Sequence, residues 1–378
     1  MKVVIAPDSF KESLSAGQVC EAIARGIRRV WPDAVIDSIP MADGGEGTVE
    51  ALIAATGGSI QRASVTGPTG EAVTAAWGML GDAGKCAVLE MASASGLALV
   101  PPDRRNPMLT TTYGTGELIL AAIEAGASQI LVGIGGSATT DGGAGAAQAI
   151  GARFYNRTGE LCTRGLTGGA LADVARIDMS SRDPRITAAD IRVACDVDNP
   201  LCGPRGAAAI YSPQKGATPH QVEILDRNLA HLAELVQRDL GKDIREVPGA
   251  GAAGGLGAGL IAFFEAAIQP GIQIVIDAVR LAERIADADL IITGEGRIDR
   301  QSMMGKVIEG VGRSGKAAGV PVVALVGAVG QGAEAALEVL ESYHRITPPG
   351  TPIAEALART AQALEATTAS LLPRWLSV

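Results

Sequence analysis

Residues 131–152, LVGIGGSATTDGGAGAAQAIGA, combine the parts of one α/β unit. The apolar run at 130–134 predicts a buried strand, and a helix of small residues is expected from about Ala144. Glycines in the turn between them let the backbone approach a ligand, and a helix N-terminus offers N–H groups to an anion. The alternative is a tight turn without a ligand. We interpret the turn as a phosphate site that includes Gly135, Gly136, Ser137 and Asp141.

The same pattern opens the chain. Residues 2–6 predict a buried strand that runs into PDSFK, and Ser15 is placed to cap the helix that follows. A second predicted strand at 34–40 runs into MADGGEGT. Strands that alternate with helices predict a parallel sheet, and ligands bind beyond the carboxyl ends of such strands. Substrate or phosphate contacts are therefore expected from Asp8, Ser9, Asp43, Gly44 and Gly45.

The pattern changes near residue 57 and returns near residue 288. Short alternating runs separated by glycine-rich turns predict antiparallel strands at 59–66, 72–78 and 85–90. A buried strand is expected again at 288–293, and it runs into Glu295 and then Asp299. We expect an α/β domain formed by residues 1–60 and 286–378, with a second α/β domain, residues 61–285, inserted into it.

The composition bounds the kind of protein. With 378 residues the chain is long enough for more than one domain, and its 49 glycines suit short turns between strands and helices. The net charge of −9 and the lack of a long basic run disfavour nucleic acid and anionic membranes as partners. Five scattered cysteines without a CxxC pair fit reduced thiols, and the N-terminus turns polar too early for a signal peptide. A cytoplasmic protein is therefore expected.

Acidic residues recur where predicted strands end. Carboxylates at this density repel one another unless a cation lies among them, and oxygen ligands suit Mg²⁺. Lysines and glycine-rich turns suit phosphate oxygens. For any single acid a helix cap or a turn is the alternative, but together these residues are the parts of a phosphoryl-transfer site. The set comprises Asp8, Asp43, Asp141, Asp196, Asp198, Glu295, Asp299, Lys11 and Lys215.

A second glycine-rich segment suggests a different function. Residues 249–254 match GxGxxG, the dinucleotide fingerprint, but Pro248 and charged residues precede it where a strand is required. A dinucleotide-dependent dehydrogenase is one alternative. A non-catalytic regulator that binds a sugar acid between two lobes is another, although the dense acids argue against an anion receptor. The three histidines lie outside the glycine-rich turns, which disfavours a His-based triad or a zinc site.

Several segments of the chain are long and distinctive, namely APDSFKESLSA, PMADGGEGT, NPMLTTTYGTGELI, GIGGSATTDGGAGAAQAIGA, CDVDNPLCGPRGAAAIYSPQKGA, GAGAAGGLGAG and ITGEGRIDRQSMMGK. They resemble the signature segments of the bacterial glycerate kinase family, the type I family of the galactarate and glyoxylate pathways. The resemblance extends in order from Met1 to beyond Lys306. One position departs from it, because Thr140 stands where many relatives have Asn, and a hydroxyl replaces an amide.

The resemblance implies a kinase that uses ATP and Mg²⁺ to phosphorylate D-glycerate. It also implies a flavodoxin-like domain formed by both chain ends, an inserted domain of the restriction-endonuclease-like type, and an active site in the cleft between them. The 2-phosphate is the favoured product and the 3-phosphate the alternative. It stays open which glycine-rich turn holds the nucleotide and whether the chain is a monomer or a homodimer.

On this basis we assign hypothetical roles. Asp196, which follows a predicted strand within CDVDNP, is the expected base for the glycerate hydroxyl. Lys11 and Lys215 are expected to hold phosphate or the glycerate carboxylate, and Glu295 to contact substrate or phosphate. Metal ligands are expected among Asp43, Asp196 and Asp299.

Overall fold

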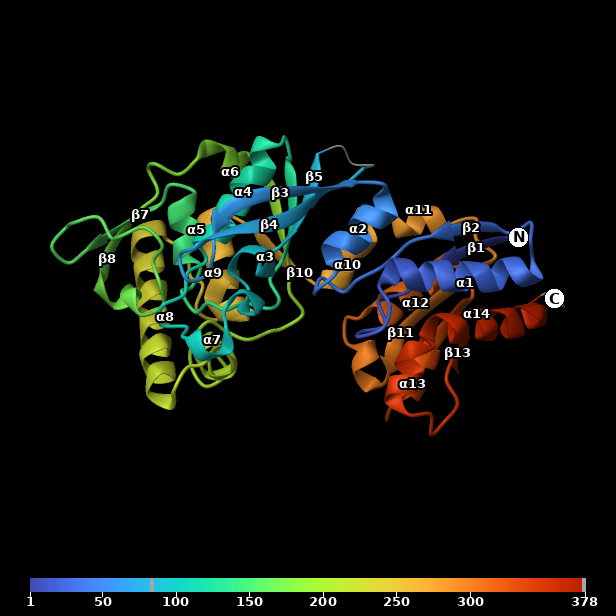
Figure 1. Ribbon diagram of the computed structural model, residues 1–378. Coiled ribbons are helices and arrows are strands. Elements are labelled where there is room, and N and C mark those ends of the chain that lie inside the picture. Colours follow the sequence, from blue (N-terminus) through green and yellow to red (C-terminus); the bar gives the residue numbers. More distant parts are fainter. Residues whose placement is uncertain (82–84, 376–378) are drawn as a thin grey trace. The chain divides into compact units, whose positions relative to one another are not determined.

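The computed structural model describes residues 1–81 and 85–375. The chain separates into two compact units. Unit 1 consists of Met1–Asp43, Glu50–Gly58 and Gly271–Val378, and therefore contains both the dark blue and the orange-to-red parts of the ribbon (Figure 1). Unit 2 consists of Gly44–Val49 and Ser59–Pro270.

Unit 1 is built on a five-stranded sheet with the order β13-β12-β11-β1-β2, in which every pair of neighbours is parallel. Counted along the chain, this order is 2-1-3-4-5, which is the flavodoxin-like arrangement. The parallel sheet predicted from the alternation of strands and helices is thus confirmed. Its strands are β1 (Lys2–Ile5), β2 (Val35–Ser38), β11 (Leu290–Ile298), β12 (Val322–Val329) and β13 (Ser342–Arg345).

Helices cover both faces of this sheet, which explains why residues 3–5, 290–292 and 322–326 of its central strands are apolar. On one face α1 and α14 share a core with β1, where Val3 and Ile5 pack with Ile23 and Leu364. On the other face α12 lies against β11 and β12 so closely that a Cβ on Gly315 would come within 2.2 Å of Val322. The helices of this unit are α1 (Ala16–Val30), α2 (Thr48–Thr56), α10 (Gly271–Ala278), α11 (Leu281–Ile285), α12 (Val307–Ala318), α13 (Ile353–Ala358) and α14 (Thr360–Leu371), with 3₁₀ turns η5 (Arg300–Met303), η6 (Ala333–Glu338) and η7 (Leu372–Trp375).

The first of these helices begins as the sequence predicts. The Ser15 hydroxyl accepts a hydrogen bond from the Gln18 N–H at 3.3 Å, and the Gln18 side chain accepts one from the Ser15 N–H at 2.9 Å. This reciprocal capping box satisfies two N–H groups that the helix cannot satisfy itself.

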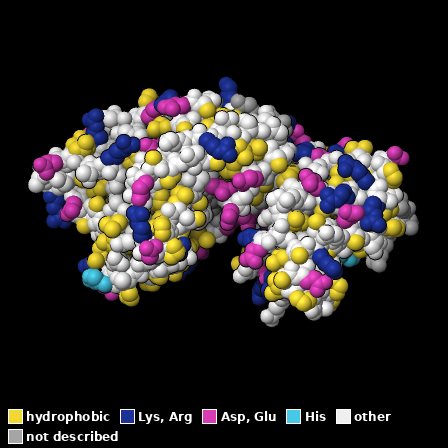
Figure 2. All heavy atoms as spheres, in the orientation of Figure 1, with side chains coloured by type: hydrophobic (Ala, Val, Ile, Leu, Met, Phe, Trp, Pro, Cys, Tyr) yellow, Lys and Arg dark blue, Asp and Glu magenta, His cyan; other side chains and the backbone are white. Residues whose placement is uncertain are grey.

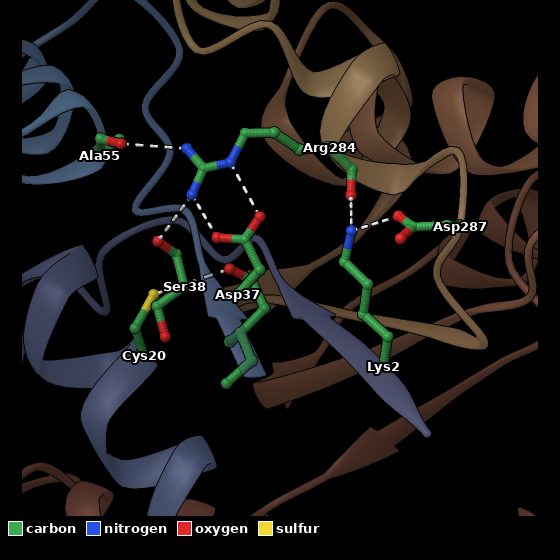
Figure 3. A network of polar contacts seen from close by, with 8 residues as sticks. Lys2, Cys20, Asp37, Ser38, Ala55, Arg284 and Asp287 are labelled. Atoms are coloured by element: carbon green, nitrogen blue, oxygen red, sulfur yellow. Dashed lines mark hydrogen bonds and ion pairs between the residues drawn. The ribbon is translucent and has the colours of Figure 1, made fainter. Parts of the chain in front are cut away.

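A side-chain network fixes the segment by which the chain returns to unit 1 (Figure 3). The guanidinium of Arg284, on α11, donates to both carboxylate oxygens of Asp37 on β2, one of them at 2.9 Å. It also donates to the carbonyl oxygen of Ala55 at the end of α2, at 3.0 Å. Lys2 in turn donates to the carbonyl oxygen of Arg284 at 2.8 Å and pairs with Asp287. One arginine therefore ties α11 to β2 and α2.

Unit 2 contains a six-stranded mixed sheet with the order β10-β9-β6-β5-β4-β3. β10, β9, β6 and β5 are parallel neighbours, whereas β3, β4 and β5 pair antiparallel, as the alternating runs predicted. A separate two-stranded ladder joins β7 and β8. The strands are β3 (Ser59–Thr66), β4 (Ala72–Met79), β5 (Cys86–Glu90), β6 (Gln129–Gly133), β7 (Arg153–Asn156), β8 (Val174–Asp178), β9 (Asp190–Ala194) and β10 (Ala267–Gln269).

The helices of unit 2 surround one large apolar core. The longest, α8, begins at a capping box formed by Thr218 and Gln221 and ends at Gly241, which has a φ of +70°. The helices are α3 (Ala92–Ser95), α4 (Tyr113–Glu124), α5 (Ala144–Ala149), α6 (Pro184–Ala188), α7 (Ala207–Tyr211), α8 (Pro219–Leu240) and α9 (Ala252–Phe264), with 3₁₀ turns η1 (Leu97–Leu99), η2 (Pro102–Arg104), η3 (Ala170–Asp173) and η4 (Pro213–Lys215).

The division into units differs from the expected domain boundaries at both ends of the insertion. Gly44–Val49 groups with unit 2, although we expected residues 1–60 to belong to the first domain. We expected the inserted domain to continue to residue 285, but α10 and α11 group with unit 1. The physical reason lies in their packing, because Ile272 and Ile276 of α10 face α12 at Gly310, and Arg284 holds α11 to β2.

Within the described residues no helix is long and apolar enough to cross a membrane. Basic and acidic side chains are interspersed over the visible face in Figure 2. Many charged side chains of the described residues form ion pairs, such as the one between Arg313 and Glu309 on α12 at 2.7 Å.

Candidate active site

A cavity of about 640 Å³ lies in unit 1, where β1, β11, β12 and β13 end. Residues that directly follow β1 and β13, the last part of β11, and residues of α13 line it. It therefore occupies the position beyond the carboxyl ends of parallel strands where such sheets bind ligands. Five of the predicted site residues line this cavity: Asp8, Ser9, Lys11, Asp43 and Glu295.

Four acidic residues line the cavity, and three of them, Asp8, Asp43 and Glu295, interact through their charges. Burial and the charge of Asp43 raise the pKa of Asp8 to about 6. Burial, with smaller effects from Asp8 and Asp299, raises the pKa of Glu295 to about 7. The hydroxyl of the fully buried Ser302 donates to Glu295. Such raised values are typical of carboxylates held together for function rather than paired for stability.

Ser9 orients one of these acids. Its backbone N–H donates to Oδ1 of Asp8 at 2.6 Å, and its hydroxyl lies 3.3 Å from the same oxygen. Two hydrogen bonds to one oxygen lower the pKa of Asp8 and oppose the effect of burial. Neither of these hydrogen bonds uses the second carboxylate oxygen of Asp8.

Basic side chains face the same cavity. Lys11 and Arg345 are exposed, and Lys306 is half-buried. The charge of Lys11 lowers the pKa of Asp8, and that of Lys306 lowers the pKa of Glu295, so both ammonium groups lie within electrostatic reach of the acids. The cavity thus combines groups that suit a cation with groups that suit an anion.

Asp299 caps a 3₁₀ turn that follows β11. Its Oδ1 accepts a hydrogen bond from the Gln301 N–H at 2.9 Å and caps η5, and its Oδ2 pairs with Arg297 at 3.1 Å. It is absent from the described lining of the cavity, although its charge reaches Glu295. The structure shows the cap that was the alternative for this residue, and its role as a metal ligand stays a prediction.

The unit 1 cavity fits Mg²⁺ in a particular way. Among residues 1–81 and 85–375 no three His, Cys, Asp or Glu side chains form a metal-binding group. Mg²⁺, however, is commonly bound by one or two carboxylates together with substrate phosphates. Asp8 and Asp43 are such a pair, and their mutual repulsion, visible in the raised pKa of Asp8, is what a cation would relieve.

The glycine-rich turn that opened the sequence lies in unit 2, between β6 and α5. Gly135 and Gly136 are exposed, and Gly136 has a φ of +71°. The next residue, Ser137, is buried. The turn therefore presents its two glycines to solvent and turns its hydroxyls inward.

The side chain of Lys215 is hydrogen-bonded to this turn. Only 2% of the residue is exposed, and its Nζ donates to Oγ of Ser137 at 2.9 Å and to the carbonyl oxygen of Thr139 at 2.5 Å. Burial lowers the pKa of Lys215 to about 7, and the charge of Asp141 partly offsets this. The ammonium group predicted to hold phosphate or carboxylate is thus bonded to the turn itself.

Asp141 is fully buried and occupies the N-terminus of α5. Its carboxylate accepts hydrogen bonds from the N–H groups of Gly143 and Gly145 and from both the N–H and the hydroxyl of Thr112, at 2.7–3.3 Å. Burial raises its pKa and these four hydrogen bonds lower it. The helical N–H groups that we expected a phosphate to receive therefore bind a carboxylate of the chain itself.

The remaining predicted residues also lie in unit 2. Asp196 is exposed and follows β9, separated from it by Cys195. Gly44 is buried with a φ of +90°, and its carbonyl oxygen would lie 2.9 Å from a Cβ on Gly133 at the end of β6. Gly45 follows directly and precedes α2. These three residues are not among those that line the unit 1 cavity.

The GxGxxG segment has a packing function in the structure. Gly254 has a φ of +70°, and a Cβ there would lie 1.9 Å from the carbonyl oxygen of Thr139. The carbonyl oxygen of Gly254 also accepts a hydrogen bond from the Gly142 N–H at 3.1 Å. These glycines allow two backbone segments of unit 2 to touch, and no strand leads into them, as a dinucleotide site requires.

Sequence reasoning missed several residues of the cavity. Lys306 lies within one of the distinctive segments, ITGEGRIDRQSMMGK, and could have been singled out there. Arg345 and the apolar side chains of α13, Ile353 and Leu357, carry no local signal, because only the sheet order brings β13 and the following loop to the cavity.

Comparisons with known proteins agree with this picture. The sequence matches the model of the glycerate kinase family over residues 3–376. It is 55% identical to a glycerate 2-kinase of Escherichia coli (strain K12) over 329 residues, 87% of this chain and 86% of that protein. It is 50% identical to a glycerate kinase of Bacillus subtilis (strain 168) over 368 residues, 97% and 96% of the two chains.

A solved structure gives the same result for the fold. The crystal structure of a protein designated glycerate kinase 2 from Salmonella typhimurium LT2 superposes with a TM-score of 0.90 at 47% sequence identity. The match covers 100% of this chain and 98% of that one. The α/β fold with parallel sheets is thereby confirmed. This chain belongs to the glycerate kinase family.

Proposed function

We propose that this chain transfers the γ-phosphoryl group of ATP to D-glycerate and forms 2-phosphoglycerate. The observation that carries the proposal is the unit 1 cavity, where Asp8, Asp43 and Glu295 meet Lys11 and Lys306 beyond the ends of parallel strands. The names of the similar proteins, glycerate kinase and glycerate 2-kinase, supply the substrate and the position of the product phosphate.

The chemistry of phosphoryl transfer explains why these groups are needed together. Little covalent work falls to the protein, so catalysis depends on positioning and on stabilising negative charge. Lysine ammonium groups stabilise phosphate oxygens, and Ser9 fixes the rotamer of Asp8. Mg²⁺, when bound, would neutralise phosphate charge, and Asp8 and Asp43 are the residues that would hold it.

The general base has two candidates. We retain Asp196, which the sequence places at a strand end of unit 2 and which is exposed to solvent. Glu295 is the second, because its pKa of about 7 makes it a stronger base at neutral pH than an ordinary carboxylate.

Single substitutions separate the two candidate bases. The true base should lose about 10²–10⁴-fold in kcat as Asp196→Asn or Glu295→Gln. It should also lose the acidic limb of the pH–rate profile, which the other variant should keep. Asp198→Asn is the matched control for Asp196, since Asp198 is an exposed acid paired with Arg205. Normal turnover in Asp196→Asn would remove Asp196 from this role.

Residues of the glycine-rich turn have supporting roles in the proposal. Gly135 and Gly136 would contact substrate or phosphate through their backbone, and Lys215 would act as a positioning residue through Ser137. Lys215→Arg and Lys215→Met should therefore lower kcat without shifting the pH profile of the base. We also propose that units 1 and 2 are the two domains of the enzyme, the second inserted into the first.

A direct assay tests the proposed activity. Purified protein is incubated with ATP, Mg²⁺ and D-glycerate, and ADP release is followed by a coupled reaction. Phosphorus NMR of the product distinguishes the 2-phosphate from the 3-phosphate. Turnover dependent on D-glycerate is expected, with L-glycerate as the control substrate. Glycerate binding without turnover would instead favour a non-catalytic regulator, and quenching of nicotinamide fluorescence on titration would favour a dehydrogenase.

A further inference from the structure

The unit 1 cavity has two chemically different walls. The acids and lysines described above form one of them. The other is apolar and comes from the C-terminal part of the chain, with Ile346 after β13 and Ile353, Ala356 and Leu357 on α13. Ile353 is 78% exposed, which is unusual for so large an apolar side chain at the rim of a cavity.

We propose that this cavity is the nucleotide site of the enzyme. ATP lies in it with its base against Ile353 and Leu357 and its phosphates toward Lys11, Lys306 and Arg345. The inference rests on the proposed kinase function and assigns the nucleotide to one unit, a choice that the sequence left open between two glycine-rich turns.

Size favours a nucleotide over glycerate in this cavity. A volume of about 640 Å³ falls within the range of roughly 300–1,000 Å³ that sites for larger organic ligands occupy. Glycerate is a three-carbon acid without an apolar part, so it would leave most of the volume and the whole apolar wall unused. A nucleoside triphosphate has a flat apolar-faced base at one end and a polyanion at the other, which matches the two walls.

Charge favours it as well. Among the described residues, Lys11, Lys306 and Arg345 form no salt bridge, although most arginines near the surface of unit 1 do, including Arg284, Arg297 and Arg313. The charges of Lys11 and Lys306 reach Asp8 and Glu295 without forming a salt bridge, so all three cations can still bind an anion that enters the cavity. Triphosphate oxygens would supply that anion, and the hydroxyls of Thr347 and Thr351 lie on the same lining as further donors.

The glycine-rich turn between β6 and α5 in unit 2 has fewer groups that could bind a triphosphate. Its helix, α5, has only six residues, and the N–H groups of Gly143 and Gly145 donate to the carboxylate of Asp141. Lys215, the cation that contacts this turn, is buried and hydrogen-bonded to it. A phosphate that reached the N–H groups at the start of α5 would have to displace Asp141, which is fully buried.

Nucleotide binding to the full-length protein tests the proposal. The dissociation constant of Mg²⁺ and AMP-PNP, a non-hydrolysable ATP analogue, is measured by calorimetry for Ile353→Asp and Arg345→Met. Each should weaken binding by about tenfold or more and raise the KM for ATP in parallel, while the KM for D-glycerate changes less than about twofold. Leu337→Asp is the matched control, since Leu337 is 50% exposed on η6 of unit 1 and does not line the cavity.

Adenosine, which carries no phosphate, separates the contribution of the apolar wall from that of the charged wall. Ile353→Asp should weaken adenosine and AMP-PNP alike, whereas Arg345→Met should weaken AMP-PNP and leave adenosine unchanged. Wild-type affinity for AMP-PNP in both variants, in an enzyme that phosphorylates glycerate, would overturn this inference and leave the proposed function standing. Nucleotide binding that these variants weaken, in a protein that does not turn over glycerate, would support the site and contradict the proposed function.

Discussion

Glu295 allows the free-energy cost of burying an ionised carboxylate in this cavity to be measured. The side chain is 5% exposed, and burial raises its pKa from the usual 4.5 to about 7. Because the folded-state pKa lies above the unfolded one, this group favours the folded state below about pH 4.5, and that contribution is lost as the pH rises through about 7. At about 1.4 kcal/mol per pKa unit, the ionised carboxylate costs the folded state about 3 kcal/mol at about pH 8.

Glu295→Gln should remove this cost. The variant should be more stable than the wild type by about 3 kcal/mol at about pH 8 and differ from it by no more than about 1 kcal/mol at about pH 5. Urea unfolding followed by circular dichroism gives both free energies, and because both proteins retain Asp8, only its small charge effect on Glu295 enters the difference. Stabilisation by loss of an acid is typical of sites kept for activity.

The control and the refuting result are equally specific. Glu341→Gln changes an exposed acid of unit 1 and should leave the pH dependence of stability unchanged. If Glu295→Gln were less stable than the wild type at about pH 8, or if its effect were the same at both pH values, then Glu295 would not be ionised at a cost in this cavity, and its assignment as a tuned carboxylate would be refuted.

Three further substitutions test the packing and the buried charge. Gly254→Ala should lower the free energy of unfolding in urea by more than about 3 kcal/mol because its Cβ would lie 1.9 Å from a carbonyl oxygen, whereas Gly241→Ala, with the same φ of +70° in open space, should cost about 1 kcal/mol. Arg284→Ala should cost about 2 kcal/mol in thermal unfolding because it leaves a half-buried carboxylate unpaired, against no more than about 0.5 kcal/mol for the exposed pair broken by Arg280→Ala. Lys215→Met should gain stability relative to the wild type as the pH falls from about 9 to about 6, because a buried ammonium with a lowered pKa destabilises the fold when it is charged. Urea unfolding at both pH values measures this difference, and the opposite trend would contradict the burial of Lys215.

Much of unit 1 could be predicted from local patterns. Apolar runs followed by polar turns located β1 and β11, and the parallel arrangement then implied that Asp8 and Glu295 lie at one edge of the sheet. The place of α10 and α11 could not be predicted in this way, because an amphipathic helix does not reveal which sheet it covers. Nor does any local signal connect Arg284 with Asp37, which lies near the other end of the chain.

The glycine-rich turns show most clearly what could not be predicted from the sequence. The sequence places Asp141 at the start of a helix, and the structure confirms that helix in α5. It could not reveal whether the helical N–H groups face an incoming phosphate or the carboxylate of Asp141, since both need the same residues at the same spacing. The roles of Asp196, Gly44 and Gly45 stay predictions, because they lie at strand or helix ends whose surroundings depend on residues far away in the chain.

The discontinuity of unit 1 has a consequence for how the chain folds during synthesis. β1 pairs with β11, so that Val3 lies beside Leu290, whereas nearly all of unit 2 comes from the single span Ser59–Pro270. Unit 2 is therefore complete on the growing chain while β1 still lacks its partner on one side. Closing so long a loop is slow, and strand edges left open invite aggregation. Until β11 is synthesised, the edge of β1 that will pair with it stays open and has to be protected from aggregation.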